Sequence, residues 1–319
     1  MSIAAQKAAY EESLERAEML AGLRAQRPWY EKLGNLAVAK PLGTVSLVII
    51  VAMWIIAIGA PVIAPYDWNQ ILVKPRFTPP SPGTWLGTDE LGRDVLSRLI
   101  WASRLSLSLS VFSVTIGTMG GTLIGLASGY FMGVFDLTVQ RITDAYNAIP
   151  QLLFLIAITS VLGTNILPVF IALTILRIPG GGRLIRSVVL SARENVYVEA
   201  AKAIGAGDAR IMFKHVFPNA YAPLIILLSI GLGANLLSQS SLSFLGLVSS
   251  VYPDWGGMLN AGARRYIERM PWMALAPGVV ITLAVLSYNM LGDALRDILD
   301  PRLRGSRAGG ARGRGAGRG

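Results

Sequence analysis

Cysteine is absent from this chain of 319 residues, and His215 is its only histidine. The lack of thiols excludes disulfides, thiolate metal sites and a cysteine nucleophile. A single histidine excludes a histidine cluster for zinc or iron. Charged residues are also scarce, at 15%, against about 25% in an ordinary soluble domain. We therefore expect no metal site, no resident cofactor and no catalytic residue, and a chain outside most soluble classes.

A nucleotide-binding loop is missing as well. The phosphate-cradling loop requires Gly-x-x-x-x-Gly-Lys followed by Ser or Thr, and no Gly-Lys pair occurs anywhere in the chain. ATP hydrolysis by that route is excluded. The glycine run at 180–182 could form a phosphate-binding nest, but residues 176–179 before it are typical of the end of a membrane span. We interpret the run as a helix break.

The chain does contain long uncharged runs in which its apolar residues, 53% of the total, are concentrated. A bilayer core about 30 Å thick is crossed by roughly 20 apolar residues in a helix, where every backbone polar group is paired. Five such runs, bounded by charged residues, His215 or Met270, lie at 41–66, 105–135, 145–176, 216–253 and 271–292. The third is long enough for two helices, and the turn residues at 163–165 divide it. The sequence thus predicts an all-α membrane bundle of six spans.

Lysine and arginine near the span ends predict the orientation. Basic residues precede the first span, follow the last and fill the segment between the fourth and fifth. An even number of spans places these three regions on one side, which we take as cytoplasmic. Arg264, Arg265 and Arg269 fall in a short predicted external loop and count against this orientation.

The two ends of the chain differ from its apolar middle. We expect residues 1–41 to form a cytoplasmic amphipathic segment, residues 42–300 the transmembrane domain, and residues 301–319 a basic, disordered cytoplasmic tail rich in Arg and Gly. The net charge of +10 suits a chain beside anionic lipid as well as one bound to nucleic acid. We interpret the tail as a solvated appendage beside lipid.

The segment between spans four and five is long for a membrane loop, so structure of its own is expected there. Residues 199–203 favour helix and Gly205 is a natural C-terminal stop. A second short helix is predicted over 208–216, after which Pro218 should reset the chain before span five. Two short helices with small residues could form a docking surface for another protein. They could equally form an amphipathic connector that rests on lipid.

The run EAAKAIGAGDARIMFKHVFPN resembles the coupling loop, or EAA loop, of ABC importer permeases. That family's pattern is Glu-Ala-Ala, a glycine four residues after the last alanine, and a hydrophobic-proline pair further on. Glu199, Ala200, Ala201, Gly205 and Pro218 match it residue by residue. The resemblance places the predicted coupling loop at 191–218.

Other stretches resemble the dipeptide, oligopeptide and nickel branch of that family, and in particular its C-type permease. They are GTDELGRDVLSRLIWASRLSLSLS (87–110), SLSFLGL (241–247), DWGGML (254–259) and LGDALRDILDPRLR (291–304). The chain departs from the pattern at Gln239, where the family often has glutamate. The stretch RIPGGGRLIR (177–186) has glycines where the family has aromatic residues, which should loosen the link between span four and the coupling loop.

The resemblance implies a permease subunit that forms half of the pathway for di- or oligopeptides across a bacterial plasma membrane, with both termini cytoplasmic. The implied partners are a homologous second permease, one or two ABC ATPase subunits that bind ATP and magnesium, and an extracytoplasmic substrate-binding protein. The lipid bilayer surrounds the chain, and no nucleic-acid partner is expected. Glu199 would contact a basic residue of the ATPase, Ala200 and Ala201 would allow close packing, and Gly205 would form the turn.

Polar residues inside the spans are the candidates for a solute path. They are Asn147, Gln151, Asn235, Gln239 and Asn289. Each is more often an interhelical hydrogen bond than a solute contact. Pro150 could kink span three beside Gln151 and open a polar site, as broken helices do in other transporters. No residue distinguishes peptides from nickel chelates, oligosaccharides or opines.

Two other classes remain open at this stage. An autonomous secondary transporter requires membrane carboxylates or histidines that titrate or bind ions, and the apolar runs are nearly free of them. A membrane-anchored nucleic-acid-binding protein rests on the Arg/Gly tail alone.

Deleting the residues after Arg304 separates the tail-based class from the transport class. Uptake of labelled solute by membrane vesicles should persist, because the spans and the coupling loop are untouched. Binding of nucleic acid should disappear if the tail is the functional element. A truncated chain that loses uptake while the full chain binds RNA would contradict the transport interpretation.

Overall fold

The computed structural model describes residues 40–299, and within this range it contains helices and no strand. The long helices are α3 (Pro41–Ile58), α5 (Val95–Phe131), α8 (Ile166–Arg193), α11 (Tyr221–Phe244) and α13 (Trp272–Leu299). The shorter ones are α4 (Ala60–Ile63), α6 (Gly133–Asn147), α7 (Gln151–Leu162), α9 (Val196–Ala203), α10 (Asp208–Arg210), the π-helix η1 (Ile211–Val216), the 3₁₀-helix η2 (Phe217–Ala220) and α12 (Trp255–Arg265). The predicted all-α class is confirmed. The predicted tail at 301–319 and all but the last two residues of the N-terminal segment lie outside the described residues.

Five helices of the described part are long and apolar enough to cross a bilayer, namely α3, α5, α8, the continuous helical stretch Asp208–Phe244 and α13. The third predicted span, which ends at the turn 163–165, corresponds to α7 and the last residues of α6, and these two helices form a bent pair that meets at 93°. Pro150 precedes α7 with extended backbone, and a residue before proline is itself disfavoured in helix. The predicted kink beside Gln151 is therefore present, and the count is six only if the bent pair crosses as one span.

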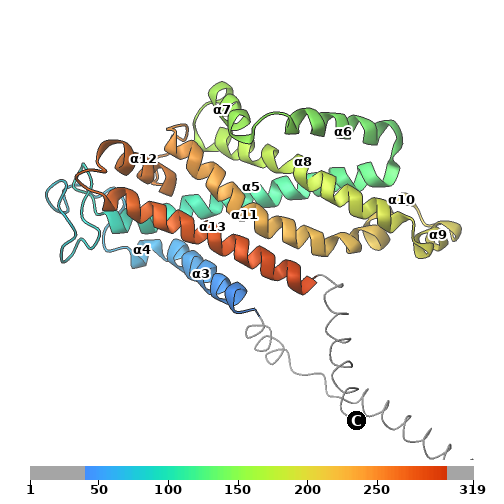
Figure 1. Ribbon diagram of the computed structural model, residues 1–319, viewed down its shortest axis with the longest axis horizontal. Coiled ribbons are helices and arrows are strands. Elements are labelled where there is room, and N and C mark those ends of the chain that lie inside the picture. The colour runs from blue at the N-terminus through green and yellow to red at the C-terminus, as the bar shows by residue number, and fades with distance from the viewer. Residues whose placement is uncertain (1–39, 300–319) are drawn as a thin grey trace, which may run out of the picture. The chain divides into compact units, whose positions relative to one another are not determined.

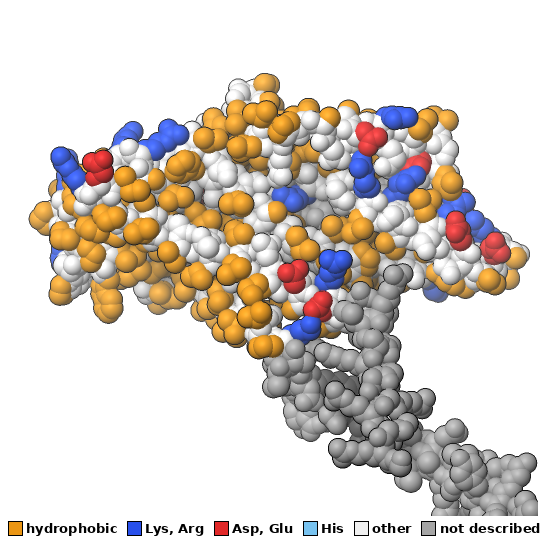
Figure 2. Space-filling view, in the orientation of Figure 1, with side chains coloured by type: hydrophobic (Ala, Val, Ile, Leu, Met, Phe, Trp, Pro, Cys, Tyr) orange, Lys and Arg blue, Asp and Glu red, His pale blue; other side chains and the backbone are white. Residues whose placement is uncertain are grey.

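The apolar surface of the spanning helices is what a lipid environment requires. On α3, Val48, Ile55 and Ile58 are all exposed. A helix pairs its backbone amide and carbonyl groups internally, so only apolar side chains face the lipid. Figure 2 shows hydrophobic side chains spread over most of the visible face, while many charged side chains lie toward the two ends. The fold is thus that of a polytopic membrane bundle.

The spanning helices run alongside one another, with different short elements at the two ends (Figure 1). The helix pair with the most extensive contact is α5 with α8, followed by α11 with α13. One end, which we call the α12 end, carries α12 and the loop at 64–94. The other, the α9 end, carries α9 and α10. The bent pair α6–α7 lies beside α8.

Glycines form the seam between α5 and α8. Gly117, Gly121, Gly125 and Gly129 recur at every fourth residue of α5, so they share one face. A Cβ atom added at Gly121 would collide with the Ile178 carbonyl oxygen, and one at Gly125 with the backbone of α8. Such spacing of small residues allows two helix backbones to come into direct contact in a membrane.

The predicted helix break at the glycine run 180–182 is wrong. Helix α8 continues through Pro179 and all three glycines to Arg193. Gly181 and Gly182 are buried against α5, where Gly182 faces Gly121. Neighbouring helices stabilise a proline- and glycine-containing span in this way, so the run serves close packing. The link from span four to the coupling loop is a continuous helix.

Replacing Gly125 by alanine should destabilise the protein by about 1–3 kcal/mol, because the added methyl group overpacks the seam against Gly182. Gly180→Ala is the matched control, since no atom lies within 4 Å of a Cβ at this position of the opposite helix. That control should keep or slightly raise stability through higher helix propensity. Melting temperatures of the two purified variants in detergent test the seam, and equal values would contradict it.

Candidate functional site

A carboxylate fastens the loop at the α12 end to the start of α5. Asp89, which is 3% exposed, accepts hydrogen bonds from Arg93 Nε at 2.7 Å and Arg98 Nη1 at 2.5 Å. Asp94 caps α5 by accepting from the Ser97 backbone amide at 2.7 Å. Ion pairs with this little exposure hold geometry well, since removing either partner leaves a buried charge. The GTDELGRD block is therefore a structural clasp.

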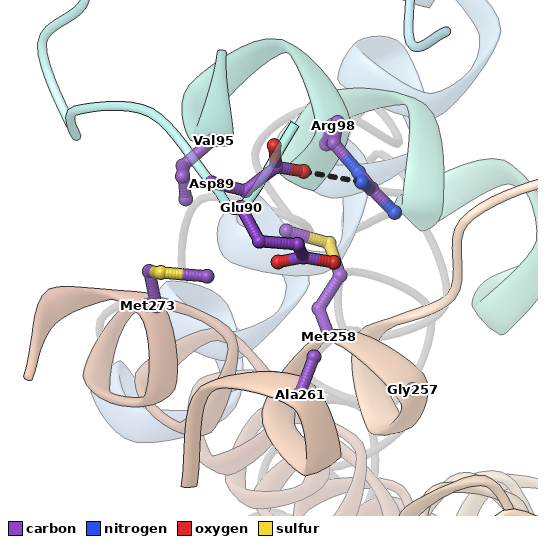
Figure 3. Close-up of a pocket in the computed structure, with 8 residues that line it drawn as sticks. All are labelled: Asp89, Glu90, Val95, Arg98, Gly257, Met258, Ala261 and Met273. Atoms are coloured by element: carbon purple, nitrogen blue, oxygen red, sulfur yellow. Dashed lines mark hydrogen bonds and ion pairs between the residues drawn. The ribbon is translucent and has the colours of Figure 1, made fainter. Parts of the chain in front are cut away.

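A small pocket of about 50 Å³ lies beside this clasp. Figure 3 shows Asp89 and Arg98 on one side and Met258, Ala261 and Met273 on the other, so the pocket separates a charged wall from an apolar one. The pocket is about the size of one or two water molecules rather than of a solute. It belongs to the packing of α12 against α5.

Helix α12 is anchored by the DWGGML block. Trp255 is 1% exposed, and its indole Nε1 donates to the Leu99 carbonyl at 3.1 Å. Asp254 caps the helix by accepting from the Gly257 amide at 3.0 Å. Burial raises the pKa of Asp254 above its usual range, against the opposing effect of the Gly257 amide bond. The DWGGML block is therefore also structural, because its polar groups form the helix cap and the contacts between helices.

At the α9 end, the connection between α8 and α11 contains both predicted short helices. Helix α9 ends in a Schellman motif, in which the Ala206 amide donates to the Ala201 carbonyl and the Gly205 amide to that of Lys202. Gly205 has φ +80°, a conformation that favours glycine. The predicted stop at this residue is confirmed.

The second short helix is present as α10 followed by the π-helix η1, and it differs from expectation in this helix type and at its end. Ile211, Met212 and Val216 are buried together, as their spacing predicts. Pro218, however, does not reset the chain. It occupies the first turn of η2, where a missing amide proton costs nothing, and the helical path runs on into α11.

The matched coupling residues face two directions. Glu199, Ala200, Gly205 and Pro218 are exposed, whereas Ala201 is buried in the protein's own core. Two large apolar side chains beside them are strongly exposed, Val196 at 79% and Ile204 at 85%. We call α9 with Ile204 and Gly205 the α9 surface. Exposed apolar side chains around a single carboxylate are typical of a binding surface.

The α9 surface is tied to the spans through Tyr130 near the end of α5. The Tyr130 hydroxyl donates to Asp208 Oδ1 at 2.6 Å, and the Arg193 guanidinium donates to the Tyr130 carbonyl at 2.9 Å. The Lys202 ammonium lies 5.6 Å from the centre of the Tyr130 ring. Val198 joins the same core as residues of α5 and α8. The surface should therefore move with these helices as one body.

The predicted solute-path residues divide into two groups. Gln151 donates to Ser238 of α11 at 2.9 Å, and Asn235 and Gln239 lie buried on the same side of that helix. Asn147, at the end of α6, and Asn289, on α13, are exposed, and no hydrogen bond joins either of them to these residues within the described part.

Arg177 is the residue that the sequence analysis missed. Its Nε donates to Asn235 Oδ1 at 3.4 Å, so a cation joins the polar group between α8 and α11. In the sequence it marked the boundary of an uncharged run, yet α8 extends 16 residues beyond it. A charge inside a helix rather than at its end was the available signal. Among the described residues, no group of three or more histidine, aspartate or glutamate side chains gathers to hold a metal ion.

This chain is similar to proteins of a known family. Residues 121–305 match the family described as binding-protein-dependent transport system inner membrane component. The chain belongs to this family. Residues 38–80 also match the N-terminal transmembrane domain of oligopeptide transport permease C. The protein is thus a multi-pass, C-type permease subunit of an ABC importer, a class of membrane transport components rather than of enzymes.

Individual relatives are similar along most of the chain. The dipeptide transport system permease protein DppC of Alkalihalophilus pseudofirmus is 40% identical over 281 residues, which cover 88% of this chain and 92% of that protein. The di/tripeptide permease DppC of Pseudomonas aeruginosa is 42% identical over 258 residues, with 78% and 84% covered. The glutathione permease GsiD of Pectobacterium atrosepticum is 39% identical over 262 residues, with 82% and 85% covered.

A solved structure shares the fold. A chain of the methionine ABC transporter MetNI in an inward-facing conformation aligns with a TM-score of 0.52 and 19% identity, covering 65% of this chain and 96% of that one. At this identity the likeness concerns the helical architecture alone.

Replacing Asp89 by asparagine should destabilise the permease by about 2 kcal/mol or more, because Arg98 loses its carboxylate in a little-exposed site and Arg93 keeps only the longer contact with Glu90. Asp67→Asn is the control. Asp67 is exposed, and asparagine can accept the same bond from the Asn69 amide, so stability should change by less than about 0.5 kcal/mol. Thermal unfolding in detergent measures both. A loss as small for Asp89→Asn as for the control would refute the clasp.

Proposed function

We propose that this permease forms half of a translocation pathway for short peptides and couples it, through the α9 surface, to a separate ATPase subunit. The named solutes of the similar permeases are dipeptides, di- and tripeptides and glutathione, itself a tripeptide. These names support a peptide solute over nickel chelates, oligosaccharides or opines. The membership in a binding-protein-dependent family argues against an autonomous secondary transporter.

The observation that carries the coupling proposal is the exposure of the α9 surface on a rigid support. Val196, Glu199 and Ile204 project from a short helix whose other face is buried. Val198 and Ala201 pack into the protein's own core. A lipid-resting connector would place the exposed Val196 and Ile204 in the bilayer, but it would take the exposed carboxylate of Glu199 there as well, at a high cost. The exposed face is therefore free for a protein partner.

Coupling requires that the partner contact the α9 surface differently in its two states. The ATPase subunits would bind ATP and magnesium, approach each other and then separate after hydrolysis. Glu199 would engage a basic residue of the ATPase, while Ala200 permits close approach. Since Tyr130 ties α9 and α10 to α5, a displacement of the surface would reach the α5–α8 pair without a flexible joint.

The remaining partners and the orientation follow from this assignment. The α9 end would be cytoplasmic, together with both termini, and the α12 end would face the extracytoplasmic substrate-binding protein. A homologous second permease would supply the other half of the pathway. Residues 42–300 would form the transmembrane domain, with the coupling loop at 191–218.

Replacing Gly205 by arginine should abolish uptake and release the ATPase, while the chain remains inserted. The added side chain obstructs the α9 surface, and φ +80° at this position is unfavourable for it. Gly205→Asn is the matched control, because asparagine tolerates this backbone conformation and adds little bulk. Uptake of labelled peptide by membrane vesicles and co-purification of the ATPase in mild detergent are measured for both.

The two variants separate docking from folding. Retained uptake in Gly205→Arg would refute the docking assignment. Loss of both the ATPase and the second permease in Gly205→Arg would indicate misassembly rather than blocked docking. If the wild-type protein does not co-purify with an ATPase, an autonomous secondary transporter becomes the favoured interpretation.

A further inference from the structure

Arg177 lies far from both ends of its membrane helix. It is eleven residues beyond the start of α8 at Ile166, which places it about 17 Å along a helix that rises 1.5 Å per residue. That depth is near the middle of a hydrocarbon core about 30 Å thick. A charge at such a depth is expensive, so it persists where it faces a polar interior and has a function.

Arg177 differs from the next two arginines of α8 in lacking a carboxylate partner. Arg183 donates to Asp144 at 2.6 Å, and Arg186 donates to Asp136 at 2.5 Å. Among the described residues, Arg177 has only the long bond from Nε to Asn235, and its Nη2 atom is buried without a hydrogen-bond partner. Within residues 40–299, no carboxylate forms an ion pair with it.

Unused donors surround this guanidinium. The Asn235 amide nitrogen is buried without a partner in a residue that is 0% exposed. The Tyr146 hydroxyl, also buried without a partner, lies within electrostatic reach of Arg177. Buried polar groups are nearly always bonded, so three unpaired donors from α6, α8 and α11 mark a site for an acceptor.

The chemistry of the donors selects the ligand. Arginine matches the planar geometry of a carboxylate through paired N–H bonds, and it cannot lose its proton in a protein. An amide and a phenol add neutral donors that suit the same negative oxygen atoms. A groove of about 250 Å³ is lined by residues of α5, α6 and α8, and Tyr146 is the one member of the donor group that borders it. A small ligand therefore has room next to the cluster.

We propose that Arg177, Asn235 and Tyr146 form a binding station for the carboxylate of the solute, part-way through the membrane. The inference deepens the peptide-permease function proposed above and rests on it, because a peptide carries a free carboxylate at its C-terminus. The station would hold that group after the binding protein releases it. Pairing with Arg177 would neutralise the charge of the peptide carboxylate and so lower the free-energy cost of moving the peptide through the bilayer.

The test compares two probes that differ in this one group, trialanine and trialanine amide. Uptake of each is measured in vesicles that contain the complete transporter and its binding protein. Arg177→Gln should lower uptake of the acid about tenfold or more, the scale expected for a lost charge-assisted bond, and leave the amide nearly unchanged. Arg177→Lys should retain part of the preference. Arg141→Gln, which removes an exposed cation from α6, should behave as wild type.

The ratio of acid to amide isolates the permease, because the binding protein contributes the same preference to every variant. Equal losses for both probes would overturn the proposal, since they would mean that Arg177 serves packing or pairs with a carboxylate of the second permease. Unchanged uptake of the acid would overturn it too, by placing Arg177 off the path.

A second measurement separates failure of this inference from failure of the peptide function. The melting temperature of the purified transporter is compared in sodium propionate and in sodium chloride at equal concentration. Propionate should stabilise the wild type and not Arg177→Gln, a variant that should itself fold because it removes an unpaired buried charge. If wild-type vesicles take up neither peptide, a propionate effect that depends on Arg177 still supports the station, and its absence overturns it.

Discussion

Backbone contact between α5 and α8 is the constraint on which the other features depend. The glycines of α5 bring the two helices together over residues 117–129, and α8 remains continuous because its own glycines face that seam. Close approach of this kind stabilises helix pairs in lipid, where burying apolar surface provides no net gain. The pair is then a single rigid element that carries a polar group in its middle and the α9 surface at one end.

The carboxylates at the two ends of the bundle lie in opposite environments. At the α12 end, Asp89 and Asp254 are buried and serve as ion-pair partner or helix cap, so the carboxylates are used within the chain. At the α9 end, Glu199 is exposed among apolar side chains that no residue within 40–299 covers. The first arrangement holds the loops in place, and the second leaves a surface available. Between them, Arg177 combines burial with incomplete pairing, which sets it apart from both.

Several structural details were beyond the sequence for identifiable reasons. The glycine run at 180–182 has the local chemistry of a break, but packing against α5 overrides that preference. Pro218 reads as a stop, yet the first turn of a helix tolerates proline. The Pro150 kink was anticipated, whereas its 93° angle was not, because the angle depends on what α6 and α7 pack against. Arg177 was taken as a boundary, because a linear run does not reveal that the helix continues beyond it.

The sequence by itself determined the membrane class and the helical bundle, since uncharged runs of sufficient length form helices in lipid, and it located the contiguous motif proposed for coupling. The end of α9 at Gly205 was equally predictable, because this helix stop depends on the backbone angles of that residue. Only the tertiary structure decided that Ala201 faces inward while Ala200 faces out, and that Arg177, Asn235 and Tyr146 gather from three helices. These contacts depend on how the helices pack side by side, which no single stretch of sequence encodes.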